Sequence, residues 1–315
     1  MVRPLASLLA VLALTGQVAA DPSDPADPAG DGAGPARKHD HTVTQILRGP
    51  FRTSRLFAMP TADVIGAYMI SISGDGSLLQ HTGLLTSAGV LAAGFGDLAQ
   101  LEYRHSAAIS VTGVNAPLPG VGVQVKIPIP EYPNVPVLGV AFRLGVPRTE
   151  TLSNTDVIEQ VTDLYIVARW RFSAFDWLTL HGGTRISSAK IELSGERSVA
   201  PVKKTLYLPT AGYDVRMNDS ARIVGEIALA PQFRWKPGTE TDPTIGYGLL
   251  GRLGMRWAVI PSVIIDGSIG YQLEVANAAP ATGPDAVVQW DIRLGAEVFV
   301  PWGALACRAA GVFCD

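Results

Sequence analysis

Apolar and polar side chains alternate strictly along many stretches of this chain. In residues 287–300, VVQWDIRLGAEVFV, one row holds Asp291, Arg293 and Glu297, and the other holds Trp290, Ile292, Leu294 and Val298. Alternation with a period of two predicts an extended strand with one row on each face.

The same alternation recurs along most of the chain. It predicts about twelve strands at residues 63–73, 83–95, 98–111, 120–128, 136–146, 160–172, 177–193, 204–217, 221–235, 244–258, 262–275 and 286–300. Most exceed the five or six residues, roughly, that are usual in globular proteins. Tilted strands that cross a bilayer need ~9–11 residues, so these lengths favour a membrane protein.

Short and long connections alternate between these segments. FGDL, SAFDW and NDS are tight, whereas TGVNAPLPG, LSGERSVAPVKK and ANAAPATGPD are long. Both ends of the strand region lie on the short-turn side. The pattern predicts an all-β fold, an up-and-down antiparallel transmembrane β-barrel of about 12 strands over residues 63–300.

A soluble β-sandwich also alternates, so the outward face needs separate arguments. Phe172, Trp177, Trp257 and Phe299 lie near short turns, and Tyr207, Phe233, Trp235, Tyr247 and Trp290 lie near long loops. Two such groups predict aromatic belts at the membrane interfaces. A barrel of about twelve strands is also too wide for side chains alone to fill as a dry core. We therefore expect the apolar row in lipid and the polar row around a hydrated lumen.

The lumen row is mixed in charge with a slight basic excess. Its predicted lining residues are Arg104, Lys126, Arg143, Arg169, Arg171, Arg185, Arg252, Arg256, Arg293, Glu102, Glu226, Asp266, Asp291 and Glu297, with Arg222, Asp163, Asp214 and Glu274 on the same faces. Charged rings of this kind set ion preference in a pore. A salt-bridged, largely closed interior is the alternative interpretation.

The N-terminus has the features of a signal peptide. Arg3, the apolar run LASLLAVLAL and the small residues up to Ala20 predict a signal over residues 1–20. A membrane anchor is the alternative, but the apolar run is too short to span comfortably. Residues 21–41, rich in Asp, Pro and Gly, predict a disordered leader. Residues 42–62 are expected to form a periplasmic arm or a plug folded into the barrel, and residues 301–315 a periplasmic tail.

Composition supports export to a membrane. Hydrophobic residues make up 47% of the chain and charged residues 17%, and the net charge of -3 gives no reason to expect nucleic acid as a partner. Cys307 and Cys314 are the two cysteines. In an oxidising compartment they are expected to form a disulfide, with free thiols as the alternative.

The last strand resembles the C-terminal signal of Gram-negative outer-membrane proteins in general. In RLGAEVFV, the residues Arg293, Gly295, Val298 and Val300 match a polar residue, a glycine two positions later and apolar residues at alternating positions. The chain departs from that pattern by continuing through PWGALACRAAGVFCD. The resemblance implies a porin-like barrel in the outer membrane, in contact with membrane lipid.

Outer-membrane phospholipases and omptin-type proteases also resemble this architecture, so the histidine positions bear on whether the chain is an enzyme. His81, near Asp75, lies where an omptin-like site would be, but no second acidic pair accompanies it. His105 and Ser106 are adjacent and so face opposite ways. His181 fits a lumen-facing position. His39 and His41 lack further ligands at zinc-site spacing. No enzyme activity, cofactor or metal site is expected.

The sequence thus predicts an outer-membrane barrel that acts as a passive channel for small hydrophilic solutes. A non-conducting barrel that anchors a periplasmic or surface partner is the second hypothesis, and a surface hydrolase the third. The solute, self-association and an open lumen are left undetermined.

Overall fold

The computed structural model describes residues 54–79, 84–110, 113–128, 134–152, 154–196, 198–235, 242–260, 262–275, 289–303 and 305. No helix in this part of the chain is long and apolar enough to cross a membrane.

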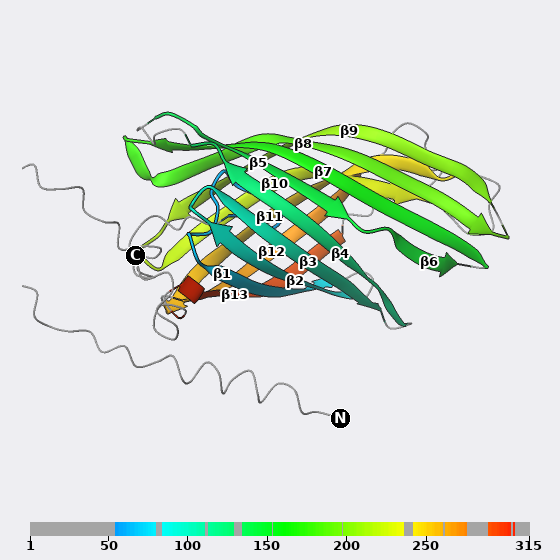
Figure 1. Cartoon of the computed structure of the whole chain (residues 1–315), viewed down its shortest axis with the longest axis horizontal. Helices are drawn as coiled ribbons and strands as arrows, with labels where there is room; N and C mark the ends of the chain where they lie inside the picture. Colours follow the sequence, from blue (N-terminus) through cyan, green and yellow to red (C-terminus); the bar gives the residue numbers. More distant parts are fainter. Residues whose placement is uncertain are drawn as a thin grey trace, which may run out of the picture. The chain divides into compact units, whose positions relative to one another are not determined.

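Thirteen strands are present in the described residues. They are β1 (Ile70–Leu79), β2 (Leu84–Phe95), β3 (Ala99–Ser110), β4 (Gly113–Lys126), β5 (Val137–Gly145), β6 (Arg148–Leu152), β7 (Thr155–Phe172), β8 (Phe175–Gly195), β9 (Val199–Arg216), β10 (Ala221–Arg234), β11 (Thr244–Ile260), β12 (Val263–Val275) and β13 (Gln289–Val300). Each pairs antiparallel with its neighbours along the sheet (Figure 1).

The strands close into a barrel through two long-range pairings. The first strand, β1, pairs with the last, β13, and β5 pairs with β7. The closed ring therefore contains twelve strands, whereas β6 pairs only with the start of β7 and stands outside the ring. The predicted all-β, up-and-down barrel of about twelve strands is confirmed.

Two features of the strand assignment differ from the sequence expectation. The short strand β6 falls in a segment that we expected to be a loop. The first strand begins at Ile70 rather than at residue 63 and runs through Asp75 to Leu79, where a loop was expected. Residues 63–65 instead lie inside the barrel, where side chains on β3, β4 and β7 bind them, and residues 66–69 continue to the short-turn end. An alternating pattern of apolar and polar residues cannot distinguish a strand from an irregular segment whose side chains are also buried in alternation.

The two faces of the barrel differ sharply in polarity. On β13, Ile292 is 58% exposed and Leu294 is 68% exposed, whereas Asp291, Arg293 and Glu297 are all below 9%. The other strands follow the same rule, with exposed Leu91, Tyr103, Val123, Ile166, Leu253 and Ile269 on the outside. Water would not tolerate so large an apolar surface on a monomer, but acyl chains would.

One tight turn shows how the short connections are built. Gly96 and Asp97, between β2 and β3, have φ angles of 61° and 54°. Positive φ at both central residues is the requirement of a type I′ hairpin, which suits the right-handed twist of paired strands. The Asp97 carboxylate also accepts a hydrogen bond from the Ala67 N–H at 2.7 Å, so this turn holds the chain shortly before β1 begins.

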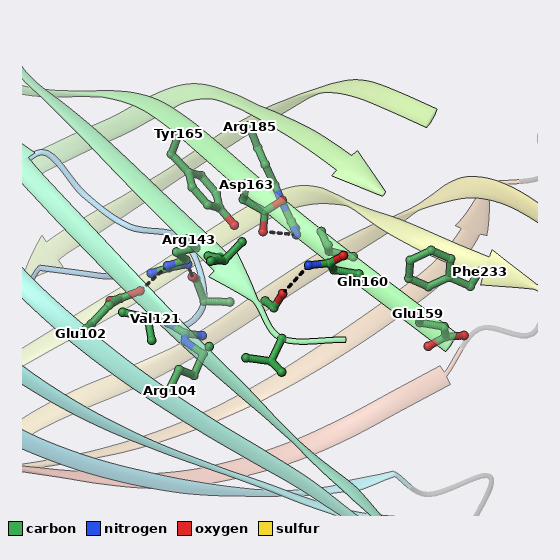
Figure 2. Close-up of a pocket in the computed structure, with 16 residues that line it drawn as sticks. Glu102, Arg104, Val121, Arg143, Glu159, Gln160, Asp163, Tyr165, Arg185 and Phe233 are labelled. Carbon is green, nitrogen blue, oxygen red and sulfur yellow. Dashed lines mark hydrogen bonds and ion pairs between the residues drawn. The ribbon is translucent and has the colours of Figure 1, made fainter. Parts of the chain in front are cut away.

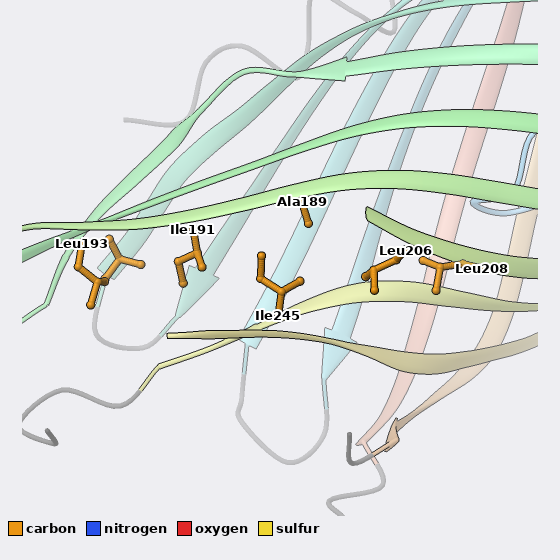
Figure 3. Close-up of a cluster of buried hydrophobic side chains, with 7 residues drawn as sticks. Ala189, Ile191, Leu193, Leu206, Leu208 and Ile245 are labelled. Atoms are coloured by element: carbon orange, nitrogen blue, oxygen red, sulfur yellow. The ribbon is translucent and has the colours of Figure 1, made fainter. Parts of the chain in front are cut away.

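At the long-loop end, the tips of β10 and β11 leave the barrel wall. Pairing of β9 with β10 ends at Thr210 and Ala228, whereas β10 and β11 stay paired up to Arg234 and Thr244. The detached tips pack against the inner face of β7, β8 and β9. There Ile245 joins a buried cluster with Val157, Ala189, Ile191, Leu193, Leu206 and Leu208 (Figure 3).

This packing corrects part of the aromatic belts. Trp177, Trp257, Tyr207 and Trp290 are about half exposed or more, as belt residues should be. Phe233, Trp235 and Tyr247 instead pack against the buried cluster, and Phe299 is itself buried against Ile65 and Met69. The sequence could not reveal this because alternation assumes that both strand neighbours remain paired.

A closed antiparallel barrel with an apolar exterior and a polar interior is the architecture of outer-membrane proteins, which satisfies every backbone group without water. The chain is therefore an outer-membrane β-barrel.

Candidate functional site

Residues Ser54–Met69 are called the inner segment below; they occupy the barrel interior from Ser54 to Ile65 and then reach the short-turn end, where Tyr68 is 48% exposed. The side chains of Leu56, Phe57, Met59 and Ala62 are all 2% exposed or less. The segment enters as a tight hairpin, in which Leu56 N–H donates to the Met59 carbonyl at 2.9 Å and Thr61 N–H donates to the Ser54 carbonyl at 3.0 Å. Of the two positions expected for residues 42–62, the described part, residues 54–62, lies inside the barrel.

The tip of the inner segment is bound by a carboxylate on β10. Glu226 accepts hydrogen bonds from three successive backbone N–H groups, those of Phe57 at 3.0 Å, Ala58 at 3.0 Å and Met59 at 3.3 Å. Consecutive N–H groups that point into one concavity form an anion-binding nest. Charge-assisted bonds of this kind are about twice as strong as neutral ones.

Arginines on other strands bind the carbonyl groups of the same tip. Arg256 on β11 donates to the carbonyls of Arg55 at 3.1 Å and Leu56 at 2.6 Å. Arg293 on β13 donates to the Phe57 carbonyl at 3.4 Å, and Arg143 on β5 to the Ala58 carbonyl at 3.3 Å. Donors and acceptors of the turn are thus satisfied by charged side chains from four strands.

The rest of the inner segment is bound by polar side chains on β3, β4 and β7. Gln124 donates to the carbonyls of Ser54, Thr61 and Asp63, and Gln100 accepts the Ile65 N–H at 3.0 Å. Arg169 forms a buried ion pair with Asp63 at 2.5 Å. These contacts replace the water that an irregular backbone would otherwise need.

Apolar contacts fill the remaining space. Leu56, Phe57 and Met59 pack against Val224, and Ala62 packs against Val137, Ala141, Tyr165 and Val167. Glycine permits a close approach at Gly139, where an added Cβ would lie 2.9 Å from Ala62 Cα. Side chains of the inner segment therefore fill this part of the barrel, where the sequence predicts a hydrated lumen.

Other charged side chains of the interior are paired with one another. Asp214 accepts hydrogen bonds from His181 at 2.9 Å and from Arg222. Arg252 pairs with Asp291 at 2.7 Å, and Arg293 pairs with Asp75 at 2.5 Å. Ser71 donates to Glu297. This network leaves most interior charges with a nearby counter-charge, as buried charges require.

A cavity of about 320 Å³ lies beside the tip of the inner segment (Figure 2). Ala58 of the inner segment lines it, together with Phe233 of the detached β10 tip. Its charged lining consists of Glu102, Arg104, Arg143, Glu159, Asp163 and Arg185. Arg143 pairs with Glu102 at 2.5 Å and Arg185 with Asp163 at 2.8 Å.

Most residues predicted from alternation to line the lumen are placed on inward faces. Five of them contact the inner segment: Arg143, Arg169, Arg256, Arg293 and Glu226. The cavity is lined by Glu102, Arg104, Arg143 and Arg185. Those that are paired or buried elsewhere in the interior are Arg252, Asp266, Asp291 and Glu297. Lys126 and Arg171 lie toward the short-turn ends of β4 and β7.

Several residues that form the polar contacts of the interior are not among the sequence predictions. Gln100 and Gln124 occupy inward positions that alternation indicates, but their amides carry no charge and so do not stand out in the lumen row. Asp63 falls at the start of a predicted strand, and Asp75 in a predicted loop. No pattern in the sequence marks either of them as an ion-pair partner of Arg169 or Arg293.

Within the described part of the chain, the histidines considered for catalysis, His105 and His181, lie on opposite faces of the barrel wall. His105 is exposed on the outer face, and His181 is buried beside Asp214. Asp75 is ion-paired with Arg293 inside the barrel. His39, His41, His81, Cys307, Cys314 and residues 1–53 lie outside the described residues.

Comparison with known proteins gives only structural likeness. No family model and no curated protein matches the chain. The NanC porin superposes with a TM-score of 0.48 at 9% identity, covering 72% of this chain and 98% of that one. The translocator domain of autotransporter NalP from Neisseria meningitidis gives 0.44 at 15%, with coverage of 73% and 87%. The KdgM porin gives 0.43 at 13%, with coverage of 72% and 98%. Scores this low add nothing to the strand pairing, on which the barrel assignment rests.

Proposed function

We propose that this protein is a passive outer-membrane channel that is held closed by its own inner segment. Small hydrophilic solutes would pass when that segment leaves the lumen. The observation that carries this proposal is the binding of three backbone N–H groups by Glu226. Because the Glu226 carboxylate accepts hydrogen bonds from main-chain N–H groups, it holds the backbone of the inner segment in the lumen.

The chemistry of the contacts supports a reversible closure. Main-chain groups of the inner segment are bound chiefly by charged or amide side chains, and water can replace each of these partners. Once the segment has left, Glu226, Arg256, Arg293 and Arg143 would line an aqueous path. Hydrogen bonds to charged groups contribute about 1.5–3 kcal/mol each, so removing one should shift the closed state measurably.

Conductance across a planar bilayer tests the proposal. We expect wild type to be closed most of the time and Glu226→Gln to open more often. The control is Glu192→Gln, which removes a carboxylate that is about one-third exposed on β8 and paired with Lys190. A folded variant lacking residues 42–69 that still fails to conduct would contradict the channel.

Selectivity of the open state follows from the charges that remain. Departure of the inner segment removes Asp63 and leaves Arg169 without that counter-charge, beside Arg171 on the same face of β7. We expect mild anion selectivity that fades as salt shortens the Debye length from ~10 Å at 0.1 M to ~3 Å at 1 M. Reversal potentials for Glu226→Gln with and without Arg169→Ser/Arg171→Ser measure it. A cation-selective pore would contradict this role of the arginines.

A permanently closed barrel is the second candidate, and the apolar packing favours it. Leu56, Phe57 and Met59 are buried against Val224, and exposing them to water would cost free energy. Such a barrel would serve as a membrane anchor for a partner. Conductance of the variant lacking residues 42–69 separates the two candidates. A channel must conduct once its inner segment is removed, whereas the anchor function does not require a conducting lumen.

A further inference from the structure

The barrel wall is incomplete at the end of β5. Pairing between β4 and β5 stops at Gly120 and Gly145, and pairing between β5 and β7 stops at Leu144 and Thr162. Beyond this point β7 pairs with β6, and β4 pairs only with β3. No ladder among the described strands joins β4 to β6.

The cavity of about 320 Å³ lies at this interruption, and residues from both faces of the wall line it. Its inner lining includes Glu102, Arg104 and Tyr165, whereas Val121, Leu144 and Val146 line it from the outer surface. Those three apolar residues are 53%, 45% and 44% exposed. Figure 2 shows the side chains of Val121 and Arg104 near each other, beside the end of β5.

Two arginines at the inner end of the cavity, Arg104 and Arg143, have buried guanidinium nitrogens that make no hydrogen bond within the described part of the chain. Arg143 and Arg185 have carboxylate partners, and both guanidinium groups lie over the Tyr165 ring, at 5.1 and 5.5 Å from its centroid. The Nε and Nη2 atoms of Arg104 are buried and make no hydrogen bond to any described residue. Buried cationic donors without acceptors favour an anionic ligand.

We propose that this cavity is a binding site for a single-chain amphiphile with an anionic head, such as a fatty acid, entering sideways from the membrane. The carboxylate or phosphate would bind Arg104. The hydrocarbon chain would pass between Val121, Leu144 and Val146 into the lipid. The cavity is at the small end of ligand pockets, ~300–1,000 Å³, so it holds the head and the first methylenes only.

The site does not depend on the channel proposal, because the cavity exists with the inner segment in place. The binding site exists in the closed state, in which Ala58 of the inner segment lines the cavity. Loss of conductance and loss of amphiphile binding are therefore separate outcomes.

Photo-crosslinking in phosphatidylcholine nanodiscs tests the proposal. A fatty acid with a diazirine in its chain should label peptides containing Val121 or residues 144–146. Unlabelled dodecanoate or dodecyl phosphate should compete, whereas dodecyltrimethylammonium should not. Competition by added phosphatidylglycerol would identify anionic membrane lipid as the natural source of the head group, and its absence would favour a free amphiphile.

Two variants separate binding from general lipid contact. Arg104→Gln should weaken labelling about tenfold, as expected for losing a charge-assisted bond. Gly120→Leu should block the site, because its side chain would fill the cavity. The backbone should accept this change, since an added Cβ at Gly120 would meet only the Leu144 carbonyl oxygen, at 3.5 Å. Arg171→Gln, outside the cavity lining, is the control. The proposal would be overturned if labelling were spread uniformly over the outer surface and neither Arg104→Gln nor Gly120→Leu changed it.

Discussion

Asp63 of the inner segment forms a buried ion pair with Arg169 of β7, with Nη1 lying 2.5 Å from Oδ1 and 2.6 Å from Oδ2. The two residues are 106 positions apart in the chain. Both side chains are at most 3% exposed, so neither charge has water as an alternative partner. The ion pair therefore couples the position of the inner segment to a residue near the short-turn end of β7.

Breaking this ion pair should destabilise the closed state. Asp63→Asn removes the carboxylate that is ion-paired with the buried Arg169, and removing one partner of a buried pair costs about 3–5 kcal/mol. We expect greater protease cleavage within residues 54–69 and a lower urea midpoint. The double variant Asp63→Asn/Arg169→Met should recover much of the loss, since it removes both charges. Equal losses in the single and double variants would argue against the coupling.

Gly139 should be intolerant of any side chain. A Cβ there would approach Ala62 Cα to 2.9 Å, so Gly139→Ala must push the inner segment away from β5. Overpacking of this kind costs about 1–3 kcal/mol. The control is Gly246→Ala, where an added Cβ meets nothing within 4 Å. Urea titration of folded barrels should show destabilisation for Gly139→Ala alone.

The outer face can be tested at Leu294. An arginine on the lipid face near the bilayer midplane costs about 2–4 kcal/mol. Leu294→Arg should therefore reduce refolding into lipid vesicles. Leu305→Arg, an exposed position after the last strand, should have little effect. Arg293→Leu should also destabilise, because Asp75 loses its partner. Unimpaired refolding of Leu294→Arg would reverse the assignment of faces.

The detached tips of β10 and β11 should depend on Ile245. This side chain is 5% exposed within the cluster on β7, β8 and β9, and Lys204 donates to its carbonyl at 3.0 Å. Ile245→Ala should cost about 2–5 kcal/mol, as for other buried aliphatic truncations. Leu253→Ala, on the same strand but 55% exposed, should cost far less. Similar unfolding midpoints for the two variants would indicate that Ile245 faces lipid.

Cys307 and Cys314 are predicted to form an intramolecular disulfide. The two cysteines are the only ones in the chain and are seven positions apart, and an exported protein is exposed to oxidising conditions. Mass spectrometry of unreduced protein should find no alkylatable thiol. Two modified cysteines under the same conditions would contradict the pairing.

The sequence by itself determined the barrel, its approximate strand number and, for most strands, which side chains face inward. Alternation with a period of two survives in the amino-acid order, since successive side chains of a strand point to opposite faces. For that reason the order of residues alone places Asp291, Arg293 and Glu297 inside the barrel, and Ile292 and Leu294 outside. The membrane followed because so long and apolar an outer row needs lipid to cover it.

Only the tertiary structure decided what occupies the interior. The ion pair between Asp63 and Arg169, and the binding of Phe57, Ala58 and Met59 by Glu226, join residues that no periodicity relates. The detachment of Ile245 and Phe233 from the outer face, and the gap beside Gly120 and Gly145, depend on where neighbouring strands stop pairing. Local alternation fixes the direction of a side chain relative to its own strand, but contacts across a closed ring depend on register and curvature, which are properties of the whole barrel.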